Sequence, residues 1–301
     1  MAPTDPQALH QGLPAPGDGL DAGRMPGHWL LARLGKRVLR PGGAELTRWM
    51  LDALDIRPDD RVVELAAGLG ATARLTLERV PGAYTAVDRD PAAVARLGTL
   101  VASGPTETAA VRADAADTGL PSGSATVVYG EAMLSMQPEP AKRRIMREAH
   151  RLLAATGGRY ALHELCLLPE DLDEVHTEAI TRDLSEAIHV GVRPLKPSAW
   201  VALLADEGFT VTARRRSPMA LLEPRRLVAD EGLAQAARIA GRALLDPAAR
   251  RRVLQMRRVF RRHRAHLGAI SLVATPTAST PNTSTPNAST PDASTSDAST
   301  P

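Results

Sequence analysis

Short apolar runs rich in β-branched residues alternate along the chain with segments whose apolar side chains recur at helical spacing. The runs have the length of strands, and the segments between them, such as 141–153 and 197–207, have the length of helices. This alternation predicts an α/β sheet. The apolar runs lie at 62–65, 84–88, 125–131, 159–165, 209–211 and 269–274.

The first run ends in closely spaced glycines, Gly68 and Gly70, before helix-forming residues. This pattern predicts a buried strand, a tight turn and the start of a helix. Because glycine has no side chain and accepts unusual backbone dihedrals, the backbone of such a turn can approach a ligand closely. We expect a cofactor over this turn.

Asp88 ends the second run, about twenty residues after the glycine turn. A carboxylate at that spacing typically receives a ribose diol, so Asp88 is a candidate ribose ligand. Ala73 stands at the third position of the Gly-x-Gly-x-x-Gly fingerprint, which tolerates alanine there. The glycines alone therefore leave NAD open as the cofactor.

Further motifs follow in a fixed order, and their order and spacing are more specific than any one of them. They are Val111 to Asp117, Leu120-Pro121, Ala125 to Glu131, Arg151-Leu152-Leu153 and Gly157 to Tyr160. From about Arg61 to Phe209 the chain resembles the class I S-adenosylmethionine-dependent methyltransferases. The resemblance implies a Rossmann-like sheet with helices on both faces, and S-adenosylmethionine as the cofactor.

The resemblance also implies roles for individual residues. Glu64 and the backbone from Ala66 through Gly68 to Gly70 would surround the methionine part of the cofactor. Asp88 would hold the ribose hydroxyls and Asp114 the adenine amino group, with Arg89 and Ala115 beside them. The family pattern is acid-x-Gly-x-Gly-x-Gly, and Ala66 replaces its first glycine.

Additions at three places in the chain are predicted to cover the site. Residues 27–39 and about 44–54 have helical spacing and precede the first strand, where many relatives carry a lid. Helical insertions at about 169–194 and 220–267 follow the fifth and sixth strands, so they can roof the carboxyl ends of the strands and form the substrate pocket.

The domain is therefore expected to span 26–275, with its core motifs within 61–215. Residues 1–25 are rich in Pro, Gly and Ala, and 276–301 repeat Ser, Thr, Pro and Asn or Asp. The first segment has no helical or strand periodicity and the second cannot bury a core, so both are predicted to be disordered.

The helix expected at 247–266 carries eight arginines around a narrow apolar stripe of Val253, Met256, Phe260 and Leu267. A solvated face is the favoured interpretation, and contact with an acidic substrate, an RNA or an acidic partner are the alternatives. The arginines are Arg250, Arg251, Arg252, Arg257, Arg258, Arg261, Arg262 and Arg264.

Composition narrows the class of protein. The chain has 301 residues and a net charge of only +3, which does not argue for nucleic acid as a partner. Cys166 is its only cysteine, so an internal disulfide and a cysteine-rich metal site are excluded, and we predict no metal. No run has the length of a membrane span, and the start does not resemble a signal peptide, so we expect a cytoplasmic protein without membrane contact.

Methyl transfer from a sulfonium needs mainly alignment, and a protein base helps only when the acceptor starts protonated. The candidate bases lie at strand ends: Glu131, His163 and Glu164. For Glu131, binding of the cofactor's ammonium group or of a nearby backbone amide is favoured slightly over catalysis. His163 and Glu164 point to opposite faces of one strand, so at most one should face the pocket.

Three functions remain open from the sequence. The leading hypothesis is methyl transfer to a small-molecule acceptor. The alternatives are a methyltransferase acting on RNA or protein, with the arginine-rich helix as its grip, and a non-catalytic protein that binds S-adenosylmethionine as a sensor or partner module. The sequence identifies neither the acceptor, nor the methylated atom, nor the oligomeric state.

Overall fold

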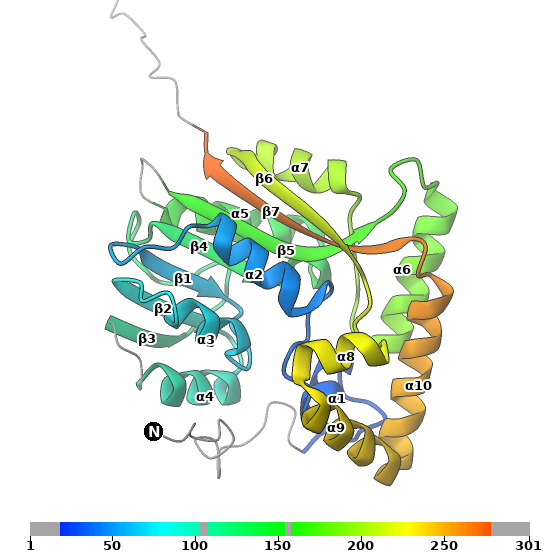
Figure 1. Cartoon of the computed structure of the whole chain (residues 1–301). Coiled ribbons are helices and arrows are strands. Elements are labelled where there is room, and N and C mark those ends of the chain that lie inside the picture. Colours follow the sequence, from blue (N-terminus) through cyan, green and yellow to red (C-terminus); the bar gives the residue numbers. More distant parts are fainter. Residues whose placement is uncertain (1–18, 103–106, 154–157, 278–301) are drawn as a thin grey trace, which may run out of the picture.

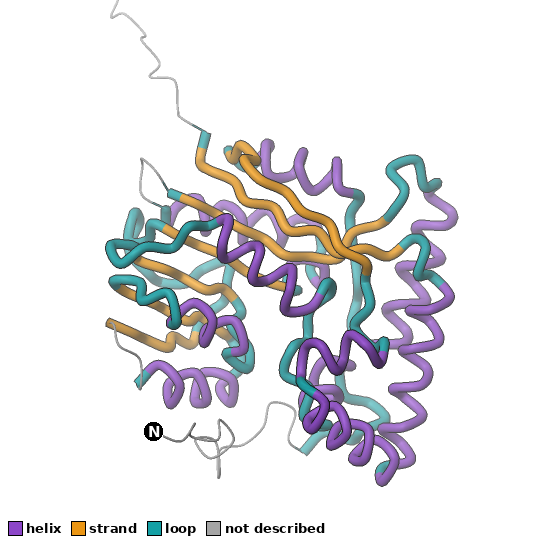
Figure 2. The backbone as a smooth tube through the Cα atoms, viewed as in Figure 1, coloured by secondary structure: helices purple, strands orange, loops and turns teal. Residues whose placement is uncertain are grey.

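The computed structural model describes residues 19–102, 107–153 and 158–277 (Figures 1 and 2). Strands in these ranges form one seven-stranded sheet of order β3-β2-β1-β4-β5-β7-β6. The pairs among β1 to β5 are parallel, and β7 is antiparallel to both of its neighbours. The strands are β1 (Arg61–Leu65), β2 (Ala83–Asp88), β3 (Glu107–Arg112), β4 (Val127–Glu131), β5 (Arg159–Leu167), β6 (Phe209–Pro218) and β7 (Leu267–Pro276).

Helices cover both faces of the sheet, as predicted. Apolar side chains of α2 (Gly43–Ala53), α3 (Ala71–Leu77) and α4 (Pro91–Val101) share one core cluster with one face. Those of α5 (Glu139–Leu152) and α7 (Pro197–Asp206) share another with the opposite face. The central strands are therefore buried on both sides, which explains their nearly continuous apolar sequences.

The remaining helices gather beyond the end of the sheet and form what we call the helical roof (Figure 1). The first predicted insertion contains α6 (Glu174–Ile188), and the second contains α8 (Pro224–Glu231), α9 (Leu233–Leu245) and α10 (Pro247–Arg262). α1 (Gly27–Arg33) completes the roof, and a third apolar cluster joins α1, α6, α9 and α10. The placement of both insertions is confirmed, whereas α8 is a helix that the periodicity did not reveal.

The predicted helix at 27–39 is too long, since α1 ends at Arg33. Gly35 has a φ of 100°, which an α-helix cannot continue through. The residues that follow are bound to the helical roof instead. The Glu231 carboxylate accepts hydrogen bonds from the backbone N–H groups of Arg37 and Val38, at 2.8 and 2.9 Å. Tertiary contacts thus override the helical pattern over the last turns.

The predicted disorder of 1–25 is wrong for its described part. Residues 1–18 lie outside the described residues, as do 278–301 of the predicted tail. Ala22 and Met25, however, are buried in the helical roof. Their backbone carbonyls accept hydrogen bonds from the buried guanidinium of Arg252, at 3.3 Å each.

That contact also corrects the picture of the arginine-rich helix. Arg252 lies on the buried side of α10 together with Met256 and Phe260, and not on a solvated face. Others are ion-paired at the surface: Arg257 and Arg261 lie near Glu223, and Arg262 near Asp183, at 3.4 to 3.8 Å. The helix ends at Arg262, slightly earlier than predicted.

Candidate functional site

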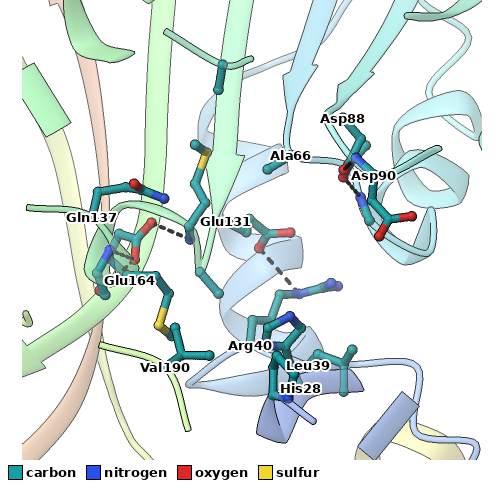
Figure 3. Close-up of a pocket in the computed structure, with 18 of the residues that line it drawn as sticks. His28, Leu39, Arg40, Ala66, Asp88, Asp90, Glu131, Gln137, Glu164 and Val190 are labelled. Carbon is teal, nitrogen blue, oxygen red and sulfur yellow. Dashed lines mark hydrogen bonds and ion pairs between the residues drawn. The ribbon is translucent and has the colours of Figure 1, made fainter. Parts of the chain in front are cut away.

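A cavity of about 720 Å³ lies at the carboxyl ends of β1, β2, β4 and β5, beneath the helical roof. Figure 3 shows Ala66, Asp88 and Asp90 on one side of it, Glu131 in the middle, and Gln137 and Val190 on the other side. The cavity therefore runs without interruption from the glycine turn to the roof.

The turn between β1 and α3 forms part of the cavity wall, as expected for a cofactor site. Gly68 and Gly70 both have left-handed backbone conformations, with φ of 57° and 72°. A Cβ atom at Gly70 would lie 2.6 Å from a side-chain carbon of Leu100, so any other residue would be strained at this φ and would displace the Leu100 side chain. Ala66 also has a positive φ, 56°, in a region that alanine adopts only at a cost.

Asp88 ends β2 and lines the cavity beside this turn. Its carboxylate accepts hydrogen bonds from the backbone N–H groups of Gly68, at 2.8 Å, and Asp90, at 2.9 Å. These contacts fix the carboxylate against the turn. Since each carboxylate oxygen has two lone-pair directions, capacity remains for a ligand.

The other predicted adenosine ligands also line the cavity. Asp114 follows β3, and its carboxylate accepts a hydrogen bond of 2.8 Å from the backbone N–H of Ala116. Ala115 and Arg89 lie in the same wall. The structure thus brings together all of the residues to which the resemblance gave an adenosine role.

Glu64 lies beneath the turn and is almost inaccessible to solvent. The hydroxyl groups of Tyr84 and Tyr129 both donate hydrogen bonds to its carboxylate, at 2.5 and 2.7 Å. Burial is the largest influence and raises the pKa of Glu64 to about 7, although the tyrosine hydrogen bonds oppose it. Neither tyrosine hydroxyl was singled out in the sequence, because their positions follow only from the strand register.

Glu131 ends β4 and is the centre of a buried polar network. Its carboxylate accepts a hydrogen bond from Thr47 at 2.6 Å and another from Thr72, and lies 3.4 Å from the Arg40 guanidinium. Burial alone would raise the pKa of Glu131, but the positive charge of Arg40 and the hydrogen bond from His163 outweigh it and hold the pKa at about 2. The carboxylate is therefore ionised at neutral pH.

His163 belongs to this network and is not among the residues that line the cavity. Its Nδ1 lies 2.6 Å from a Glu131 oxygen, and its Nε2 donates to the Pro41 carbonyl at 2.5 Å. Both ring nitrogens thus contact oxygen atoms of the protein.

Glu164, its neighbour on β5, points to the other face, as predicted, and lines the cavity. Its carboxylate accepts hydrogen bonds from the backbone N–H groups of Met133, Leu134 and Ser135 and from the Ser135 hydroxyl, at 2.6 to 3.0 Å. Burial raises the pKa of Glu164, and these hydrogen bonds oppose the rise. The contacts fix the short 3-10 helix η2 (Leu134–Met136) after β4.

Sequence analysis missed Arg40, which lies in the linker between α1 and α2, is largely buried and lines the cavity. His28 also lines the cavity, beside Trp29, with ring centroids 4.6 Å apart. Burial, and then the charge of Arg89, lower the pKa of His28 to about 4. Neither position follows a sequence motif, since the helical roof places them.

The described residues contain no group of three or more His, Cys, Asp or Glu side chains that could hold a metal ion. Likewise, no helix within 19–102, 107–153 or 158–277 is long and apolar enough to cross a membrane.

Comparison with known proteins decides the family. Residues 62–157 match the family described as "Methyltransferase domain". A protein from Haemophilus influenzae, named "Uncharacterized protein", is 32% identical over 209 residues, which make up 69% of this chain and 81% of that protein. The chain belongs to the class I S-adenosylmethionine-dependent methyltransferases.

Solved structures share the fold of this methyltransferase at low identity. Geranyl diphosphate C-methyltransferase from Streptomyces coelicolor superimposes with a TM-score of 0.56 at 12% identity, over 77% of this chain and 79% of that one. A phosphoethanolamine N-methyltransferase from Haemonchus contortus gives 0.60 at 14%, over 83% and 57%. The [4+2]-cyclase SpnF gives 0.59 at 16%, over 78% and 82%. Enzymes with different named activities therefore share this fold.

The wall of the methyltransferase cavity changes character away from the glycine turn. The side formed by the helical roof is mainly apolar, and its residues come from α1, α6, α10 and the loops after α6 and β6. We call this side the apolar compartment, represented by Trp29, Ile188, Val190, Met219, Met256 and Phe260.

Proposed function

We propose that this methyltransferase transfers a methyl group from S-adenosylmethionine to a small-molecule acceptor held inside the cavity. The observation that carries the proposal is the continuity of one cavity, which joins the glycine turn at one end to the apolar compartment at the other. A cofactor and an acceptor can therefore share one cavity, and their binding would displace water from it.

The residues at the glycine-turn end suit S-adenosylmethionine. Asp88 offers carboxylate lone pairs to a ribose diol, and the open space above Gly68 allows close approach of the backbone. Asp114 lies where an adenine amino group could donate to it. Arg40 and Glu131 together offer one positive and one negative group for the methionine part. When bound, the cofactor supplies an electrophilic methyl group that an acceptor lone pair attacks in line.

We further propose that alignment, and not a protein base, drives the transfer. Glu131 is ionised and bound by four neighbouring groups, Glu164 already accepts four hydrogen bonds, and His163 does not line the cavity. His28 does line it, but with a pKa of about 4 it is a weak base. An acceptor with a free lone pair needs none of them.

An assay with labelled cofactor tests the proposal. Calorimetry first measures whether S-adenosylmethionine and S-adenosylhomocysteine bind. The enzyme is then incubated with methyl-labelled S-adenosylmethionine and separate small-molecule, RNA and protein fractions of one extract. We expect binding, and label in the small-molecule fraction only. Label in RNA or protein would overturn the small-molecule acceptor, and binding without any label would favour the sensor hypothesis.

A further inference from the structure

The composition of the apolar compartment indicates the chemical class of the acceptor. Its wall is formed by the helical roof, and four segments contribute to it: α1, α6 with the following loop, the loop after β6, and α10. Two of its representative residues, Met219 and Met256, are methionines, whose flexible thioethers adapt to irregular apolar ligands. Burying hydrocarbon against such a wall is favourable for each methylene removed from water.

Several titratable groups near this compartment are paired, hydrogen-bonded or neutral, whereas Arg144, an exposed residue of the cavity wall, has no ion pair among the described residues. Arg37 lies 3.2 Å from the Glu231 carboxylate, and Arg40 lies 3.4 Å from Glu131. The Glu164 carboxylate accepts four hydrogen bonds. His28 is neutral at neutral pH, because its pKa is about 4. An ion that entered beside the paired groups would therefore lose its hydration without gaining a free counter-charge from them.

The side-chain amide of Gln137 is a neutral polar group that can bind a ligand in this region. The side-chain amide of Gln137 lies in the cavity wall on the same side as Glu164 and Val190 (Figure 3). It has no hydrogen-bond partner among residues 19–102, 107–153 and 158–277, although the backbone carbonyl of the same residue binds Lys142 at 3.0 Å. The amide can both donate and accept, so it suits a hydroxyl, carbonyl or amide of a neutral ligand.

We infer that the acceptor is an uncharged, mainly hydrophobic small molecule whose body fills the apolar compartment and whose polar group hydrogen-bonds the Gln137 amide. This inference rests on the proposed function and names its substrate class. It excludes polar metabolites and ions of comparable size as preferred acceptors.

Simple homologous ligands test the inference while the acceptor is unidentified. The full chain, saturated with S-adenosylhomocysteine, is titrated calorimetrically with 1-alkanols from butanol to decanol, and with alkyl carboxylates and alkylammonium ions of equal length. Affinity for the alcohols should rise about threefold to fourfold per methylene until the compartment is full. The alcohols should bind more tightly than both ions of the same length.

Variants locate the binding. Val190→Glu places a charge in the compartment from a loop, so it should abolish alcohol binding while the affinity for S-adenosylhomocysteine and the melting temperature stay near wild type. Val175→Glu is the matched control, because Val175 lies on α6 with 76% of its surface exposed. Gln137→Leu should weaken alcohol binding about twofold to tenfold, the value of one lost hydrogen bond.

Three results would overturn the inference: affinity independent of chain length, equal or tighter binding of an ion, or unchanged binding in Val190→Glu. If anions bind more tightly than alcohols, Arg144 is the residue to test first. It lines the cavity and is exposed, with no ion pair among the described residues. If the carboxylates bind more tightly than the alcohols of equal length, and Arg144→Gln removes this difference in affinity, the acceptor is an anion. Label in RNA or protein would instead refute the proposed function while leaving the alcohol results standing.

Discussion

Ala66 stands where the family pattern has its first glycine, and its backbone shows the consequence. With a φ of 56°, it holds a left-handed conformation that costs an alanine roughly 1–2 kcal/mol. The chain tolerates this cost at a turn that lines the cavity, and strained residues are common at functional sites.

Ala66→Gly should therefore stabilise the protein by about 1 kcal/mol, measured by urea denaturation. Ala95→Gly is the matched control, because Ala95 is an exposed residue in the middle of α4, where glycine costs roughly 1 kcal/mol. The two substitutions should have opposite signs. A loss of stability in Ala66→Gly would mean that the methyl group of Ala66 makes contacts that outweigh the strain.

Asp88 is predicted to hold the ribose of the cofactor. Because its carboxylate also accepts hydrogen bonds from Gly68 and Asp90, Asp88→Ala removes a ligand and loosens the turn together. Charge-assisted hydrogen bonds contribute about 1.5–3 kcal/mol each, so calorimetry should show at least tenfold weaker S-adenosylmethionine binding. Asp59→Ala, at an exposed position, should bind as wild type does. Unchanged affinity in a folded Asp88→Ala, or tighter binding of NAD, would refute the assignment.

Glu64 makes the stability of the protein depend on pH, in the direction opposite to the contribution of Glu131. The pKa of Glu64 is raised from 4.5 to about 7 in the fold, so the folded state binds the extra proton between those values. Its stabilising contribution is complete below pH 4.5 and is lost as the pH rises through 7.

Glu64→Gln stays neutral and should not lose this contribution. The stability of the variant relative to wild type should therefore rise between pH 4.5 and 7.5, by on the order of 2–3 kcal/mol. Chemical denaturation at several pH values measures the difference. A flat difference across this range would show that Glu64 is already ionised in the fold.

At the scale of the elements, the helical roof depends on Arg252 of α10. Its guanidinium donates hydrogen bonds to the carbonyls of Ala22, Gly23 and Met25, and so ties residues before α1 to the second insertion. These carbonyls belong to an irregular segment, so no backbone N–H of a regular helix replaces Arg252 as their donor.

Arg252→Ala should release this segment. Trypsin cleavage at exposed Arg24 should accelerate at least tenfold, and stability should fall by about 2–3 kcal/mol, because buried carbonyls lose their donors. Arg251→Ala, one residue away and exposed, should change neither. An unchanged cleavage rate in Arg252→Ala would show that apolar packing of Met25 alone holds the segment.

The elements differ in how far the sequence predicts them. β1, β2, β4, β5 and their helices follow from apolar periodicity and local signals, such as Asp90, whose side chain caps α4 through Ala92 and Ala93. β3 does not, because this edge strand is only partly buried and has no continuous apolar run. The end of α1 does not, because the contacts of residues 36–38 with Glu231 decide it and lie almost two hundred residues away in sequence. The burial of Arg252 is hidden for the same reason, since its neighbours on α10 are exposed arginines.

At the scale of the whole molecule, the site also contains some residues that sequence motifs predict and others that only tertiary contacts place. Residues on the glycine turn and at the ends of β2 and β3 could be placed from motif spacing, and they line one cavity. Arg40, His28 and Gln137 could not, because the cavity wall that they form is assembled from segments without a shared motif. The acceptor side is thus the part of the site that the sequence leaves open.

Glu131 connects more of the molecule than any other predicted site residue. Its carboxylate links the linker before α2 through Arg40, α2 itself through Thr47, α3 through Thr72, and β5 through His163. The network joins the N-terminal segment to the sheet beside the centre of the cavity. A structural role of this kind and a catalytic role predict different pH behaviour.

The pKa of Glu131 is lowered from 4.5 to about 2, so its stabilising contribution is present above pH 4.5 and is lost as the pH falls towards 2. Glu131→Gln should therefore destabilise the protein by about 3 kcal/mol or more at pH 7, and the difference from wild type should shrink below pH 4.5. Glu131→Gln, His163→Ala and Glu164→Gln are compared by stability, S-adenosylmethionine affinity and, once an acceptor is known, turnover. If alignment alone drives transfer, none should lose the 10²–10⁴-fold in turnover at saturating cofactor that removal of a general base typically costs. A loss of that size in one variant, with cofactor affinity unchanged, would identify that residue as the base and replace alignment with acid–base catalysis.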